Sequence, residues 1–171
     1  MKYISYVWVF ALSLYFAFPP NGFSTSNELL DLSDMTETAS AIVMAEVVAS
    51  QVDSSDNRGL TVVNLRVTGQ IKGITQEFIT LTLPGGSYTR GRFRVGEVVA
   101  GAPQLFANQD VLLFLAEGQQ SNNYSLVGYT QGLLSIRDND GQQVVQGNVT
   151  DGQIISIGSM VEKILQVEAE Q

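Results

Sequence analysis

The stretch from Leu81 to Leu115 constrains the fold most, because it joins an alternating strand pattern to the densest apolar run of the chain. The run from Val111 to Leu115 predicts a strand at the centre of the core. Between the two lies a long connection, residues 85–108, with few secondary-structure signals, and a connection of that length is usually functional or disordered. Its aromatic and aliphatic content argues against disorder. We therefore expect this connection to be ordered and to pack on the core.

Short strand patterns separated by turn residues fill most of the remaining chain. Alternation and β-branched content predict strands over residues 42–52, 61–67, 78–83, 110–115, 124–129, 133–137 and 142–146. Pro84 and the two glycines after it should end the third of these strands, since proline cannot donate to a ladder. The sequence Asp138-Asn139-Asp140-Gly141 is typical of a tight hairpin turn.

Helical patterns occur only at the two ends of the chain. Residues 27–38 have a near-helical apolar spacing, which predicts a short N-terminal helix. A second helix is predicted near the C-terminus, capped by Ser159 or by Ser156. Its expected apolar stripe consists of Ile154, Ile157, Val161, Ile164 and Leu165. This order of elements predicts a mainly β fold: a small OB-like, partly open β-barrel with a short N-terminal helix and an amphipathic C-terminal helix.

The N-terminus predicts export. Lys2 precedes an apolar stretch, Tyr6 to Phe18, and then prolines and small residues, which is the arrangement of a secretory signal peptide. We expect cleavage near Ser24, so that residues 1–24 are the signal peptide and residues 25–171 form a single β-barrel domain with terminal helices. The mature protein would be periplasmic or extracellular, with no membrane attachment. An uncleaved membrane anchor is the alternative, because the site is not a clean Ala-x-Ala.

Composition excludes several classes of function. The chain has 9 basic and 17 acidic residues, a formal net charge of −8, so nucleic acid and anionic lipid are poor partners. It contains no cysteine and no histidine, which removes thiol nucleophiles, the commonest general base and the usual zinc ligands. We predict no catalytic residue, no metal site and no cofactor.

Five segments together carry a family resemblance: AIVMAEV (41–47), VVNLRVTGQIKG (62–73), LTLPGG (81–86), GAPQLFANQDVLLFL (101–115) and YSLVGYTQGLLSI (124–136). In this series the chain resembles a family of uncharacterised exported bacterial proteins that are often associated with matrixin-type metalloproteases. Its early strands are similar to the OB-like domain of the tissue inhibitors of metalloproteinases. Those inhibitors present an N-terminal Cys to the protease zinc, and this chain has none, so the resemblance implies the fold more than the activity.

The candidate binding residues lie within the long connection. Arg90, Arg92 and Arg94 are spaced by two and flanked by Tyr88 and Phe93, and this period would direct the arginines to one side of an extended segment. Guanidinium groups pair with carboxylates and phosphates, which favours a site for an anion or an acidic partner surface. The alternative is a solvated edge that prevents sheet-to-sheet association.

Three further patterns have an ordinary structural explanation beside a functional one. The Pro84–Ser87 corner could cradle an anion with its N–H groups, although such corners more often just end a strand. The Asp138–Gly141 turn could bind calcium, but the ligand spacing of an EF-hand loop fails at both ends. Carboxylates could form a hydrolase pair, for which the candidates are Glu46, Glu97, Asp110 and Glu117.

The leading functional prediction is a non-enzymatic exported binding module. Its partner would be another exported protein, with a secreted metalloprotease as the candidate that the resemblance implies. The alternatives are a hydrolase that uses carboxylates and a structural envelope protein that associates through a barrel edge.

Overall fold

The computed structural model describes residues 29–53, 59–73, 76–99, 101–118, 122–150 and 152–170. The predicted signal peptide lies outside this part of the chain. The helical elements are α2 (Leu32–Thr38), the 3₁₀ turn η1 (Asn148–Thr150) and α3 (Ile157–Ala169). The strands are β1 (Ala41–Asp53), β2 (Leu60–Lys72), β3 (Phe78–Pro84), β4 (Gly86–Arg90), β5 (Phe93–Glu97), β6 (Asp110–Glu117), β7 (Asn123–Leu126), β8 (Leu133–Asn139), β9 (Gln142–Gln146) and β10 (Ile155–Ser156).

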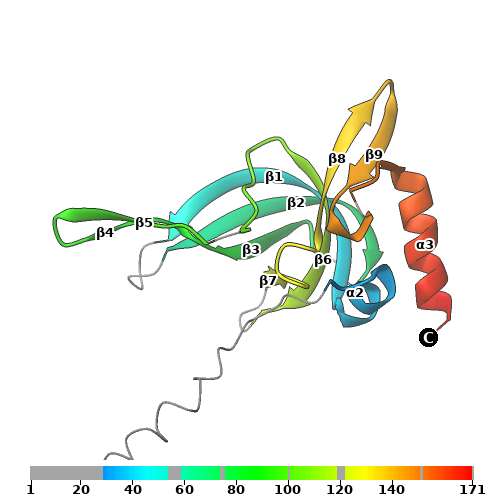
Figure 1. The fold of residues 1–171 in the computed structure, drawn as a ribbon, viewed down its shortest axis with the longest axis horizontal. Coiled ribbons are helices and arrows are strands. Elements are labelled where there is room, and N and C mark those ends of the chain that lie inside the picture. Colours follow the sequence, from blue (N-terminus) through cyan, green and yellow to red (C-terminus); the bar gives the residue numbers. More distant parts are fainter. Residues whose placement is uncertain are drawn as a thin grey trace, which may run out of the picture.

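Five strands close into a barrel (Figure 1). The larger sheet has the order β1-β2-β3-β7-β6-β8-β9-β10, and an additional pairing of β1 with β6 closes the ring β1-β2-β3-β7-β6. All pairs in the ring are antiparallel except β3 with β7, which is parallel and short, joining Thr80 to Asn123 and Leu81 to Tyr124. The predicted OB-like barrel is confirmed, but it is closed by this short parallel pairing and not partly open as expected.

Strand β6 is the hub of the sheet. One edge of β6 pairs with β1. The other edge pairs with β8 near the start of β6 and with β7 near its end. Between those two partners the chain makes a corner, in which Val127 N–H donates to Phe114 O and Phe114 N–H donates to Gly132 O, at 3.0 and 2.8 Å. The predicted strand 124–129 is therefore wrong in its second half: β7 ends at Leu126, and Tyr129 lies in the turn with a φ of 65°.

Two apolar clusters cover the two faces of β1 and β6. Alternate residues of β6, Val111, Leu113 and Leu115, face the barrel interior. Leu112 and Phe114 face the other way, into a second cluster formed with α2, α3, β8 and β9. The whole run from Val111 to Leu115 is buried, as predicted, because both faces of the strand are covered.

The two helices close the second cluster from outside, and both differ in detail from the sequence prediction. Helix α2 begins later than expected, after Asp31, whose carboxylate accepts from Asp34 N–H at 2.8 Å. Ser156 is the N-cap of α3, accepting from Ser159 N–H at 3.1 Å.

The predicted stripe of α3 is only partly correct. Its buried side chains are Met160 and Ile164, whereas Ile154 and Leu165 are exposed. Neither described helix combines the length and apolar character that crossing a bilayer requires.

Candidate functional site

The long connection contains a β-hairpin, β4–β5, which projects away from the barrel as an arm (Figure 1, green, at the left). The expectation that the whole connection, residues 85–108, packs on the core is therefore wrong for the arm. Gly91 and Arg92 form its two-residue loop, and Gly91 has a φ of 63° at the first loop position, where a type II′ turn requires glycine. Of the connection beyond the arm, Leu105 is buried in the barrel cluster.

The two aromatic candidates lie on the arm in different environments. Tyr88 is half-buried and pairs with Val95, nearer the base. Phe93 pairs with Arg90 beside the turn, and it is 76% exposed. An aromatic side chain with this exposure at the end of a projecting hairpin is available to a partner, because none of the described barrel residues covers it.

The three arginines do not share one extended segment, so the single-sided arrangement expected from their spacing is wrong. The turn separates Arg90 from Arg92, and Arg94 returns on β5 opposite Thr89. Arg92 and Arg94 are both exposed, and Arg94 donates to Ser87 Oγ at 3.2 Å. For Arg90 the structure describes only the backbone. The three arginines are thus brought to the tip of the arm by the turn, not by strand periodicity.

A set of hydrogen bonds that the sequence did not reveal fixes the base of the arm to the barrel. Gly85 N–H donates to Gly59 O at 2.7 Å, and Thr61 Oγ1 donates to Gly85 O at 2.8 Å. Gly59 N–H in turn donates to Glu97 Oε2 at 2.9 Å. The N–H of Gly85 therefore serves the strand corner, and the only acidic residue of the arm is engaged at its base. The arginines at the tip have no carboxylate beside them on the arm.

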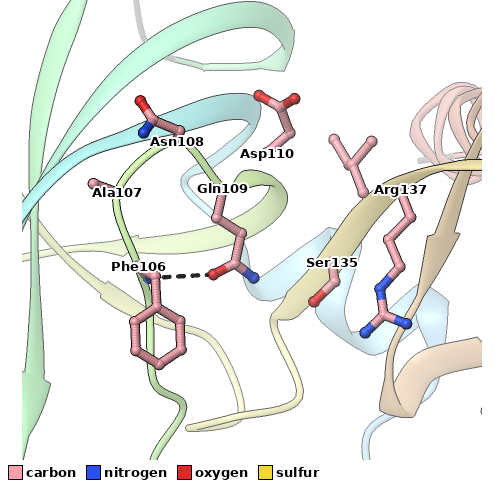
Figure 2. Close-up of a pocket in the computed structure, with 8 residues that line it drawn as sticks. Phe106, Ala107, Asn108, Gln109, Asp110, Ser135 and Arg137 are labelled. Atoms are coloured by element: carbon pink, nitrogen blue, oxygen red, sulfur yellow. Dashed lines mark hydrogen bonds between the residues drawn. The ribbon is translucent and has the colours of Figure 1, made fainter.

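An open groove of about 560 Å³ lies outside the arm, where β6 and β8 diverge (Figure 2). Its walls are residues 106–110 and residues 135–137. Figure 2 shows the side chains of Gln109, Ser135 and Arg137 directed to the same side, with the ring of Phe106 at the far end. The amide oxygen of Gln109 accepts from Phe106 N–H at 3.3 Å, which leaves the amide NH₂ toward Ser135.

Two of the four carboxylates considered for hydrolysis, Glu46 and Asp110, lie on an outward face. Glu46 lies opposite Asp110 in the β1–β6 ladder and forms an ion pair with Arg66 of β2. The hydrogen bond and charge of Glu46 raise the pKa of Arg66 above its ordinary value, with smaller contributions from Glu77 and Asp110. Because neighbouring residues Ala45 and Val111 face the barrel interior, the Glu46–Asp110 pair points away from it. Glu46 and Asp110 therefore do not form the inward-facing acid pair that would favour the hydrolase alternative.

The Asp138–Gly141 segment is a hairpin turn, as predicted. Asp140 and Gly141 have φ values of 54° and 82°, typical of a type I′ turn, and Asp138 Oδ1 accepts from Gly141 N–H at 2.8 Å. Across the described ranges, no three side chains of His, Cys, Asp or Glu gather closely enough to hold a metal ion.

Comparison with known proteins adds no further assignment, since neither a protein-family model nor a curated protein matches the chain.

Proposed function

We propose that the protein is a non-enzymatic exported binding module that recognises another exported protein with the tip of the β4–β5 arm. The observation that carries the proposal is Phe93, a large apolar side chain held 76% exposed on a hairpin whose base is fixed to the barrel. Fully burying such a ring in a partner would contribute about 1.5–3 kcal/mol.

Charge defines the kind of partner surface. Arg92 and Arg94, which precede and follow Phe93 in the sequence, are both exposed at the tip of the arm, in a chain whose formal net charge is −8. Aromatic and arginine side chains are the types most often found at the energetic centre of protein interfaces. The partner should therefore offer an apolar pocket bordered by acidic groups. A secreted matrixin-type metalloprotease is the candidate that the family resemblance implies.

Two point variants of the mature chain test the proposal. The mature protein is used to capture partners from the host's exported proteins, and the captured protein is then titrated against wild type and Phe93→Ala. Phe78→Ala is the matched control, because Phe78 is 55% exposed on β3 outside the arm. Truncating a central interface aromatic costs at least about 2 kcal/mol, roughly a thirtyfold weaker Kd, whereas the control should change little.

Two results would overturn the proposal. One is an equal affinity of wild type and Phe93→Ala for the captured protein; the other is the capture of no specific protein at all. Titration of a purified matrixin-type metalloprotease separately tests the partner class, and its failure would leave the arm as a recognition element for a different exported protein.

A further inference from the structure

The outer half of β8 has an unpaired edge. On one side β8 pairs with β9 from Ser135 to Asn139, and on the other it pairs with β6 only from Leu133 to Ser135. From Ile136 onward, no described strand pairs with the edge that faces β6, and the groove of about 560 Å³ opens there. A free strand edge beside a groove can accept an extended chain through main-chain hydrogen bonds.

The side chains in the groove specify what such a chain should carry. The guanidinium of Arg137, the hydroxyl of Ser135 and the amide NH₂ of Gln109 are directed to the same side (Figure 2). Arg137 makes no ion pair within the described residues. The one acid of the lining, Asp110, is directed away from these three groups and lies in the ladder with Glu46, which pairs with Arg66. These three groups all donate hydrogen bonds, and no acidic side chain of the groove lining points toward them. Together they suit the acceptor oxygens of a carboxylate supplied by a ligand.

An apolar contact lies at the other end of the groove. Phe106 is 66% exposed there, although its backbone is held by Gln109. Alternate side chains of an added strand point to the same face, so a strand on the β8 edge could direct one side chain to Arg137 and another toward Phe106.

A second copy of this chain fits the edge poorly. Directly opposed residues in an antiparallel pair share a face, so a two-fold pairing of β8 with itself joins residues of equal parity. A register centred on residue 137 places Arg137 opposite its own copy, and one centred on residue 138 does the same for Asp138. A register centred on residue 139 places Asp138 opposite Asp140. Like charges directly opposite destabilise a pair. A register centred on Ile136 would need the edge of Ser135, which β6 occupies.

We propose that the groove between β6 and β8 binds an extended peptide segment of another protein, which adds to the β8 edge as a strand and pairs a carboxylate with Arg137. The carboxylate is an Asp or Glu side chain or a chain terminus. This site is separate from the arm, and its occupant is a flexible peptide and not a folded surface.

Selection from a display library of randomised linear peptides, with the full mature chain as target, tests the proposal. Selected peptides should share one acidic position, and the best of them is then made synthetically with a free or an amidated C-terminus. Arg137→Gln should weaken its Kd at least tenfold. Lys163→Gln is the matched control, because it removes the same charge from an exposed position on α3.

Three variants of the synthetic peptide separate the contributions. Replacing its acid by the amide, or amidating its terminus, shows which carboxylate meets Arg137, and one of the two should cost about tenfold. N-methylation of alternate peptide amides should abolish binding if the peptide adds as a strand, since it removes the donors. Shortening the β4–β5 arm should leave peptide affinity unchanged, so this test is independent of the proposal for the arm.

The proposal is overturned if no peptide is enriched, if the selected peptides bind Arg137→Gln as well as wild type, or if N-methylation has no effect. It is also overturned if sedimentation shows a dimer of the free protein that the selected peptide dissociates, because the edge would then belong to a second copy.

Discussion

Strand β6 and the β4–β5 arm each carry a phenylalanine on a β-strand, and the fates of the two rings are opposite. Phe114 is fully buried, whereas Phe93 is 76% exposed. The difference lies in what surrounds each strand: β6 is paired along both edges and covered on both faces, while the arm is an isolated two-stranded hairpin. An isolated hairpin is only marginally stable in water, so the arm depends on the hydrogen bonds at its base. Strand propensity alone therefore does not tell which aromatic side chain is buried and which is exposed. What decides it is whether other strands and helices cover the faces of the strand.

The largest expected effect comes from exchanging the two phenylalanines for alanine. Phe114→Ala should lower the free energy of unfolding by about 3–5 kcal/mol, because it leaves a cavity in a fully covered cluster. Phe93→Ala should change it by no more than about 0.5 kcal/mol. Urea unfolding followed by circular dichroism measures both. Similar losses for the two variants would mean that the arm packs on the barrel.

Two glycines give an effect of opposite sign in the two regions. A Cβ at Gly132 would lie 2.6 Å from Val127 O and 2.9 Å from Phe114 O, so Gly132→Ala must distort the corner beside β6, at a cost of about 1–3 kcal/mol. A Cβ at Gly96 on the arm would meet nothing within 4 Å, and Gly96→Ala should stabilise by about 0.4–1 kcal/mol. Thermal unfolding compares the two variants, and a destabilised Gly96→Ala would contradict the open arm.

Removing the arm should have a smaller effect. Gly86 and Glu97 are directly paired, so residues 87–96 can be replaced by Asn-Gly while the base is kept. We expect the free energy of unfolding to fall by less than about 1 kcal/mol, since the removed segment contributes no residue to the two buried clusters. The denaturant dependence should remain a single transition. A loss of several kcal/mol would show that the barrel needs the arm.

The smallest effect concerns alkaline pH. Burial, and then the charge of Glu117, raise the pKa of Tyr124 above its ordinary value of 10.0. The folded state thus favours the neutral phenol, and this stabilisation is present below the unfolded pKa and is lost as the pH rises above it. Wild type should therefore lose stability from about pH 10 upward more steeply than Tyr124→Phe. Parallel losses in unfolding experiments across that range would contradict the burial of the hydroxyl.

Much of the barrel was predictable, because its strands combine alternation with turn residues. The run Val111–Leu115 predicted a strand at the centre of the core, and the Asp138–Gly141 turn predicted the β8–β9 hairpin. Both predictions are confirmed. The parallel contact of β3 with β7 could not be predicted, since it involves two residue pairs far apart in the sequence. The error in the α3 stripe has a similar cause: Met160 is buried because of what α3 packs against, which helical periodicity does not specify.

The arm and its anchors were less predictable for a physical reason. Strands β4 and β5 bury little, and their apolar–polar alternation is confined to Phe93-Arg94-Val95, which is too short to predict a strand. The available signal was Gly91 between two short extended segments, which a type II′ turn explains. The bond from Gly59 to Glu97 joins residues that only the closed barrel brings together. The free edge of β8 could not be predicted either, because it depends on the residue at which β6 stops pairing with β8.

The position of β6 also decides when this chain can fold. Its partner β1 is made early, and the Ala41–Leu115 pair must wait for a segment synthesised much later, while β7 and β8 must follow before β6 is complete. Contacts of such long sequence separation slow folding, because the loop between them must close first. During synthesis, which starts at the N-terminus, β1 and β2 can therefore pair with each other but leave their apolar faces uncovered. The barrel cannot close until the chain has been made as far as residue 126, the end of β7. Such a chain has a long interval in which it is still unfolded, the state that passage through a narrow channel requires.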